Sequence, residues 1–120
     1  MSYVGFRLTA AQLEDGVYVV SVRGDLDLPQ TPEVERELEA LQEKGHRHLI
    51  VDLLDVPFLE SSVVWVLVRH SRRLRMNGGV FTVVSDNDAV TSEIDRHLHG
   101  DFRITSTLSQ ALADTAVMAT

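Results

Sequence analysis

Two adjacent hydroxyl side chains, Ser61 and Ser62, are the groups in this sequence best placed for chemistry. They follow a short apolar run and a loop with a proline, and they precede the apolar segment 63–68. A serine where a helix begins can cap it, because its oxygen accepts a free backbone N–H of the first turn. It can also carry a phosphate, whose charge of about −1.5 to −2 near pH 7 suits the same N–H groups. Both interpretations stay open from these residues alone.

Catalysis by a serine would require a base beside its hydroxyl. No Gly-x-Ser-x-Gly motif surrounds the pair, and the spacing of the acids and histidines indicates no partner for Ser61. Two further carboxylates, Asp25 and Asp27, follow a predicted strand. Paired acids can do acid–base work when their environments differ, but solvated loop acids are the simpler interpretation. We therefore expect no catalytic residue and a protein that is not an enzyme.

The five histidines do not form a recognisable metal-binding pattern. His46 and His48 stand just before a predicted strand. His97 and His99 stand at the end of a predicted helix, where positive charge is favourable. Neither pair has a third ligand at a metal-site spacing, and His70 lies among arginines, where we expect it at the surface. The sequence predicts no metal site and no cofactor.

The composition indicates one acidic globular domain spanning residues 1–120. The chain is 44% hydrophobic and has a formal net charge of −7. Because phosphate contacts need lysine and arginine, this charge argues against nucleic acid or anionic membranes as partners. The chain contains no cysteine, and no apolar run approaches the roughly 20 residues of a membrane span. We expect a cytoplasmic protein that does not insert into a membrane.

The two serines lie between a predicted strand and a predicted helix. Leu49 to Leu54 is a short apolar run interrupted only by Asp52, as in a strand buried on both faces. The segment after the serines is rich in valine, which favours a strand. It nevertheless continues to Met76 without a helix breaker, turns basic toward its end and stops at Gly78-Gly79. These signals favour a helix capped by one of the two serines.

The remaining segments predict strands and helices in alternation. Glu14-Asp15-Gly16 is a hairpin turn signal, and Thr31-Pro32-Glu33 predicts a helix start with Thr31 as the N-cap. This order implies an α/β fold, a mixed and mostly parallel sheet of about five strands with about four helices packed on it. The other predicted strands are Val4 to Ala10, Val17 to Arg23, Val80 to Val84 and Phe102 to Thr105, and the other helices run from Thr31 to Gly45, from Val90 to near Gly100, and onward from a cap at Ser106 or Thr107.

Three segments share an order and a spacing with one known family. A strand leads into Gly24-Asp25-Leu26-Asp27, the central strand leads through a loop to Glu60-Ser61-Ser62, and Gly78-Gly79 precedes a further strand. This series resembles the STAS domain of bacterial anti-sigma factor antagonists, with its Gly-Glu-Leu-Asp segment, Asp-Ser-Ser-Gly loop and Gly-Gly-strand segment. The similarity runs from about Val17 to Ala113.

The resemblance implies a single STAS-like domain, with its core at about residues 17–113, and a mechanism. In that family the unphosphorylated domain binds an anti-sigma factor that is also a serine kinase, and this binding frees a sigma factor. The kinase phosphorylates the first serine of the loop, here Ser61 with Ser62 as the alternative. The partners then separate, and a serine phosphatase resets the switch. The residues matching the family's partner surface are Asp25, Asp27, Glu60, Ser61, Ser62, Val63 and Trp65.

Three positions depart from the family's loop motif. Glu60 stands in place of an aspartate, and Val63 and Trp65 stand in place of glycines. Glu60 places its charge farther from the backbone, and Val63 brings a branched side chain into the first helical turn. Trp65 is either an interface anchor, since aromatic residues are enriched at hot spots, or a core residue. These changes predict either a switch with altered partner specificity or an adaptor that is not phosphorylated.

Other functional classes stay open at this point. One is a STAS-type subunit of a lipid-transport complex, another is a small ligand-binding domain, and a third is a serine hydrolase that uses Ser61. An exposed edge helix would also allow a weak homodimer.

Overall fold

The sheet at the centre of the molecule has five strands in the order β1-β2-β3-β4-β5. The computed structural model describes residues 6–14, 16–97 and 102–119. β1 pairs with β2 in antiparallel orientation, and the pairs β2–β3, β3–β4 and β4–β5 are parallel. This mixed, mostly parallel sheet confirms the predicted α/β fold. The elements are β1 (Arg7–Glu14), β2 (Val17–Arg23), α1 (Thr31–Glu43), β3 (His48–Asp55), α2 (Ser61–Met76), β4 (Val80–Val84), α3 (Asp88–His97), β5 (Arg103–Thr105) and α4 (Leu108–Ala119).

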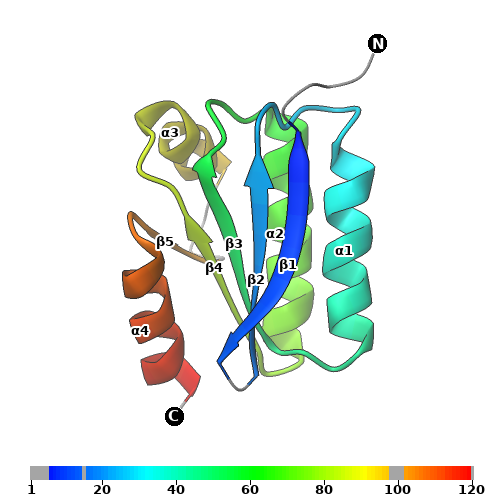
Figure 1. Cartoon of the computed structure of the whole chain (residues 1–120), viewed down its shortest axis with the longest axis vertical. Coiled ribbons are helices and arrows are strands. Elements are labelled where there is room, and N and C mark those ends of the chain that lie inside the picture. Colours follow the sequence, from blue (N-terminus) through cyan, green and yellow to red (C-terminus); the bar gives the residue numbers. More distant parts are fainter. Residues whose placement is uncertain (1–5, 15, 98–101, 120) are drawn as a thin grey trace.

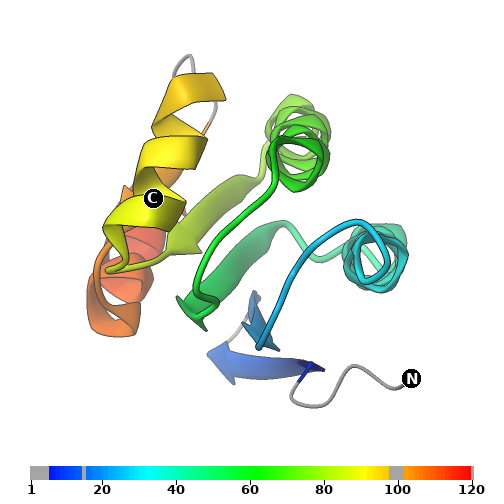
Figure 2. The same ribbon diagram turned by 90° about the horizontal axis from the view of Figure 1, so that it is seen from above.

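Helices cover both faces of the sheet. Figures 1 and 2 show α1 and α2 side by side on one face, α4 on the opposite face, and α3 near the end at which β3 and β4 finish. Successive side chains of a strand point to opposite faces. On β3, Leu49, Val51 and Leu53 therefore join the core cluster beneath α1 and α2, whereas Ile50 joins the cluster that contains Ala111 of α4. Burial on both faces explains the near-continuous apolar run of this strand.

The first strand lies later in the chain than predicted. Its predicted bounds were Val4 to Ala10, but β1 runs from Arg7 to Glu14 and pairs with β2 up to the turn at Gly16, where φ is 79°. Hairpin pairing uses main-chain groups, so it continues through polar residues such as Gln12 that do not look like a strand in the sequence. Val4 itself lies outside the described residues.

The helix starts show where side-chain patterns mislead. Gln30, and not Thr31, is the N-cap of α1, and neither serine caps α2, whose N-cap is Glu60 without a side-chain hydrogen bond. The Thr31 hydroxyl instead donates to the Asp27 carbonyl at 2.9 Å. A hydroxyl caps a helix only when its own backbone is still extended, and both Thr31 and Ser61 are already helical.

The last two helices agree better with the prediction. Thr107 caps α4, because its Oγ1 accepts the Gln110 N–H at 3.1 Å. α3 begins at Asp88, two residues before the predicted Val90, and the Asn87 side-chain oxygen accepts the Ala89 N–H at 2.8 Å. The predicted helix end near Gly100, like His99, lies outside the described residues.

The valine-rich segment after the serines is a helix, as predicted. Packing overrides the preference of valine for strands, because Val63, Val64 and Leu67 are buried in the core cluster. α2 ends at the glycine pair: Gly78 has a φ of 81°, and a side chain at Gly79 would clash with Arg47 and Leu74. Within the described ranges, no helix is long and apolar enough to cross a membrane.

Candidate functional site around Ser61

Two loops run side by side at the carboxyl ends of β2 and β3. Leu26 and Leu59 form a parallel backbone bridge between them, and both side chains are buried. The bridge brings the segment that contains Asp25 and Asp27 next to the segment that leads into α2. The carboxyl edge of parallel strands is a common place for functional sites.

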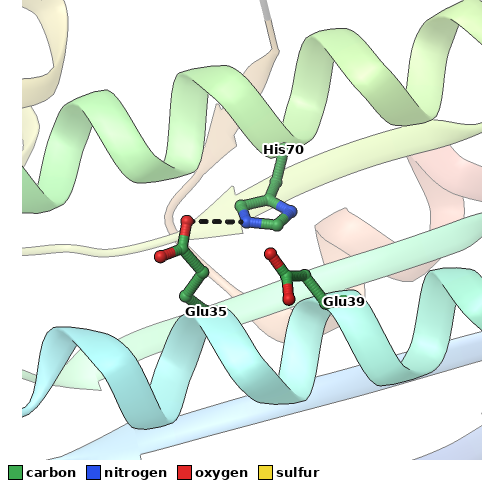
Figure 3. Close-up of side chains that lie close together, drawn as sticks. All are labelled: Glu35, Glu39 and His70. Atoms are coloured by element: carbon green, nitrogen blue, oxygen red, sulfur yellow. Dashed lines mark hydrogen bonds and ion pairs between the residues drawn. The ribbon is translucent and has the colours of Figure 1, made fainter.

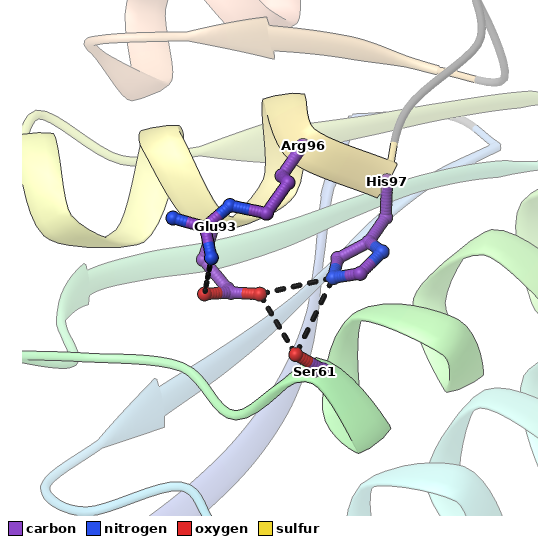
Figure 4. Close-up of polar contacts among 4 residues, drawn as sticks. All are labelled: Ser61, Glu93, Arg96 and His97. Carbon is purple, nitrogen blue, oxygen red and sulfur yellow. Dashed lines mark hydrogen bonds and ion pairs between the residues drawn. The ribbon is translucent and has the colours of Figure 1, made fainter.

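Ser61 is the first residue of α2, and its exposed hydroxyl contacts α3. Its Oγ donates to Oε2 of Glu93 at 2.9 Å. The Nε2 atom of His97 lies 3.0 Å from that carboxylate oxygen and 3.3 Å from the Ser61 Oγ (Figure 4). The Arg96 guanidinium lies 3.7 Å from the other carboxylate oxygen. We call Ser61, Glu93, Arg96 and His97 the Ser61 cluster.

The sequence did not indicate these α3 residues as partners of Ser61. More than thirty positions separate them from the serine, so no local spacing connects them. The one available signal was the spacing of Glu93 and His97 by four residues, which places both side chains on one face of a helix.

Hydrogen-bond accounting assigns a proton to the Nε2 atom of the His97 ring. The Ser61 proton points to Glu93, and an ionised carboxylate only accepts hydrogen bonds. The His97 Nε2 atom therefore carries a proton, which it donates toward Glu93 and Ser61. A serine hydrolase needs the opposite arrangement, with an unprotonated ring nitrogen facing the serine and the second ring nitrogen facing the acid. The cluster is thus a three-way hydrogen-bonded contact and lacks the geometry of a catalytic triad.

The cluster favours negative charge on α3. The hydrogen bond from Ser61 is the largest influence that holds the pKa of Glu93 below its ordinary value, with further lowering by the His97 hydrogen bond and the charges of Arg96 and His97. Partial desolvation opposes these effects without outweighing them. Glu93 is therefore ionised at neutral pH, beside the hydroxyl of Ser61.

The two loop aspartates play different structural roles. Asp25 is exposed, whereas Asp27 is half-buried and organises the start of α1 through its main chain. The Asp27 carbonyl accepts the Thr31 hydroxyl, and its N–H donates to the Gln30 side chain at 3.2 Å. Asp25 is thus the more available of the two for a partner.

Trp65 lies at the surface, so the structure excludes the core interpretation that the sequence left open. Its side chain is 50% exposed. Its ring packs against the His97 ring at a centroid distance of 5.4 Å, which joins the tryptophan to the Ser61 cluster. Trp65 also borders an open groove along α2 that Arg69 and Met76 line farther down the helix.

Sequence comparison identifies the family. The sequence model of the STAS domain matches residues 9–111. The chain belongs to the STAS domain family. It is 27% identical over 77 residues to the anti-sigma-B factor antagonist of Staphylococcus aureus, a match that covers 64% of this chain and 71% of that protein. It is 28% identical over 90 residues to the anti-sigma F factor antagonist of Paenibacillus polymyxa, covering 74% of this chain and 75% of that protein.

Solved structures agree with this assignment of the STAS domain. An anti-sigma factor antagonist from Mycobacterium paratuberculosis has a TM-score of 0.83 and 29% identity, covering 92% of this chain and 94% of that chain. Unphosphorylated SpoIIAA, also an anti-sigma factor antagonist, has a TM-score of 0.80 over 92% of this chain and 97% of its own. Its identity of 15% supports the fold alone.

Two of the STAS-motif residues face inward. The Ser62 Oγ is buried and has no hydrogen-bond partner within the described part of the chain. Val63 is fully buried in the core cluster, so it can affect a partner only through the position of the first turn of α2. Ser61 is therefore the accessible hydroxyl of the pair, and Glu60 is half-buried before it.

The prediction that His70 lies at the surface was wrong. This side chain is only 2% exposed and lies between α1 and α2 (Figure 3). The Nδ1 atom of His70 is 2.9 Å from the Gln42 amide nitrogen, and Nε2 is 3.3 Å from Glu35. Burial, followed by the charge of Arg69, lowers the pKa of His70. The neighbouring arginines suggested a surface in the sequence, and they are exposed, but His70 itself points toward α1 (Figure 3).

Glu35, Glu39 and His70 bring their ligand atoms within 4.8 Å of one another. Two carboxylates and an imidazole suit a divalent cation. However, Arg69 already pairs with Glu35, and Gln42 contacts His70, so a cation would have to displace an arginine. We interpret the group as a polar contact that joins α1 to α2. The prediction of no metal site stays a prediction.

Proposed function

We propose that this STAS domain is an anti-sigma factor antagonist that is switched at Ser61. The unmodified domain would bind an anti-sigma factor serine kinase and release a sigma factor, and phosphorylation of Ser61 by that kinase would end the interaction. A serine phosphatase would restore the binding form. The observation that carries the proposal is the exposed Ser61 hydroxyl at the start of α2, beside the acidic loop, while Ser62 is turned inward.

Exposed apolar side chains around this edge support a role in binding. Leu28 is 62% exposed and Phe58 is 46% exposed, and each lies one or two residues from the Leu26–Leu59 bridge. Trp65 adds an aromatic surface on α2. Large apolar residues that stay in solvent next to charged groups are typical of protein-binding surfaces. The proposed partner surface therefore combines Asp25, Glu60 and Ser61 with these three side chains.

Electrostatics provides a reason for partner release. A phosphate on Ser61 would lie near Glu60 and Glu93 and beside the loop that carries Asp25. At a separation of about 6 Å and an effective dielectric constant of about 20, each like-charge pair costs about 2–3 kcal/mol before screening by salt. Because about 1.4 kcal/mol changes an affinity tenfold, even a screened repulsion would weaken a modest interface strongly.

A second candidate is a STAS adaptor that binds its partner without being phosphorylated. The hydrogen bond from Ser61 to Glu93 favours it, because it holds the hydroxyl against an anion. The replacements at Glu60, Val63 and Trp65 also alter the motif that a kinase would recognise. A STAS subunit of a lipid-transport complex is the corresponding candidate if no anti-sigma partner binds.

Intact mass after incubation with ATP tests the proposal. The probes are the anti-sigma kinases with a histidine-kinase fold from the source organism. A gain of one phosphate in the parent and in Ser62→Ala, but none in Ser61→Ala, is the expected result. Binding to a kinase without any gain of phosphate would favour the adaptor. The absence of both a gain and binding would overturn the proposal in favour of the transport subunit.

A further inference from the structure

The Ser61 cluster already contains an anion bound by two basic side chains. The Glu93 carboxylate oxygen lies 2.9 Å from the Ser61 Oγ, close to where an oxygen of a phosphate on that hydroxyl would lie. The same carboxylate faces the His97 ring nitrogen at 3.0 Å and the Arg96 guanidinium at 3.7 Å. In the unmodified protein, Glu93 therefore occupies the place that a phosphoserine oxygen would need.

We propose that Arg96 and His97 of α3 form an internal binding site for the phosphate of phosphorylated Ser61, from which the phosphate expels Glu93. This inference rests on the proposed function, because it describes the modified state of the same switch. α3 would then bind the phosphate directly. The charge of the phosphate would also repel a partner, as described above.

Exchange of one anion for the other is favourable on charge and on hydrogen bonding. A phosphoserine carries about −1.5 to −2 charges near pH 7 and offers three acceptor oxygens, whereas a carboxylate carries one charge. Hydrogen bonds between ionised groups are roughly twice as strong as neutral ones. The His97 Nε2 proton already points toward Ser61 and Glu93, so the ring needs no change of tautomer to donate to the phosphate.

Glu93 cannot keep its position beside a phosphate. Both anions would compete for Arg96 and His97, and the hydroxyl proton that Ser61 donates to Glu93 disappears on phosphorylation. The hydrogen bond from Ser61 is the largest of the influences that lower the pKa of Glu93. Its loss and the new repulsion both favour rotation of the glutamate side chain away from the cluster.

The phosphate would face a defined set of charged groups. Arg96 and His97 attract it from α3, and Glu93 repels it from the same helix. Glu60, in the loop before α2, and Asp25, in the neighbouring loop, also repel it. Asp27 in that loop adds a third loop carboxylate. The proposal therefore depends on the two α3 bases outweighing these acids at the phosphate itself.

The second ionisation of the phosphate measures this balance. We would install phosphoserine at position 61 by genetic encoding, which requires no kinase, and follow the phosphate by 31P NMR from pH 4 to pH 9. Near the two α3 bases, the second pKa of the phosphate in the parent should lie below its usual value of about 6. We take this pKa as the midpoint of the titration. His97→Gln should raise its midpoint by about half a unit or more, as expected on loss of a basic group that binds the charged form of the phosphate.

Control variants separate the contributions. Arg96→Gln should raise the midpoint in the same direction, and it should leave the fold intact because the Arg96 side chain is exposed. Arg103→Gln, which removes an exposed arginine on β5 paired with Asp114, should leave the midpoint unchanged. Equal midpoints in the parent, His97→Gln and Arg96→Gln would overturn the inference.

The two proposals fail independently. If no kinase modifies Ser61 but the encoded phosphoserine shows the expected midpoints, the proposed function fails while the phosphate site stands. If a kinase does modify Ser61 but the midpoints are equal, the switch stands without the α3 site. Trp65 gives a second readout: as the single tryptophan of the chain, it should change in fluorescence on phosphorylation in the parent and less in His97→Gln.

Discussion

The Nε2 atom of His97 lies 3.3 Å from the Oγ of Ser61, although 36 positions separate the two residues. This contact joins the start of α2 to the end of α3 at the edge of the sheet where the β2–α1 and β3–α2 loops meet. A chemical change at the Ser61 hydroxyl would therefore act directly on a second helix.

Glu93→Gln should speed phosphorylation of Ser61 by the proposed kinase, by about three- to tenfold. The Glu93 carboxylate repels an incoming phosphoryl group electrostatically and accepts the hydrogen bond of the Ser61 hydroxyl. The glutamine amide keeps the size of the side chain without its charge. The measurement is the initial rate of phosphate incorporation by intact mass.

Glu43→Gln is the matched control for that experiment, because Glu43 is exposed at the far end of α1. A slower rate in Glu93→Gln would show the reverse role, in which the carboxylate assists the serine as a proton acceptor.

Ser62→Ala should leave phosphorylation intact and keep or raise stability. A buried hydroxyl without a partner costs about 1–3 kcal/mol of desolvation, and the Ser62 Oγ is buried without one among the described residues. Replacement by alanine removes that cost and leaves a small void. We therefore expect the free energy of unfolding in urea to change by between about zero and +1 kcal/mol. A loss of more than about 1 kcal/mol would mean that the hydroxyl has a partner.

The order of strands and helices could be predicted because it depends on local patterns. The apolar run of β3, the stop at Gly78-Gly79 and the turn at Gly16 are all set by nearby residues. Helix caps were less predictable: the hydroxyls of Thr31 and Ser61 look like caps, but the backbone becomes helical one residue earlier than the hydroxyl pattern suggests.

The site was predictable only in part. The family resemblance located Ser61 and the acidic loop, and the Leu26–Leu59 bridge brings their two segments together. Glu93 and His97 were missed because tertiary packing alone brings α3 to the serine. His70 was misplaced for a related reason, since a histidine between arginines looks exposed until the opposite face of the helix is shown to pack on α1.

Trp65→Ala should reduce the affinity for the proposed anti-sigma partner at least tenfold while the domain stays folded. A half-exposed tryptophan next to the Ser61 cluster is well placed as an anchor, and truncation of such residues commonly costs about 2 kcal/mol or more of binding free energy. Isothermal titration calorimetry measures the affinity, and thermal unfolding checks the fold.

Met76→Ala provides the comparison for Trp65→Ala. Met76 is 87% exposed at the other end of α2. The substitution therefore removes apolar surface from the same helix, away from the Ser61 cluster. We expect little change in affinity. Equal losses in the two variants would extend the partner surface along the whole groove of α2.

Stability should fall in mild acid because of His70. Burial, and then the charge of Arg69, hold the pKa of this imidazole below its ordinary value near 6.5, although Glu39 opposes the shift. Below about pH 6.5 the unfolded chain therefore takes up a proton that the folded protein does not. The free energy of unfolding therefore decreases as the pH falls from about 6.5 through the pKa that His70 has in the folded protein. The slope from this residue is at most about 1.4 kcal/mol per pH unit.

Urea unfolding between pH 5 and pH 8, in the parent and in His70→Gln, isolates that contribution. His48, whose pKa burial also lowers, adds a slope of the same sign that both proteins keep. Glu93 contributes only at lower pH, because its carboxyl has a pKa below the ordinary value of about 4.5. His70→Gln should therefore be less sensitive to acid between pH 5 and pH 6.5, whatever its stability at pH 8. Parallel curves would show that His70 takes up its proton equally in the folded and unfolded states, and that its contacts with Glu35 and Gln42 compensate for burial.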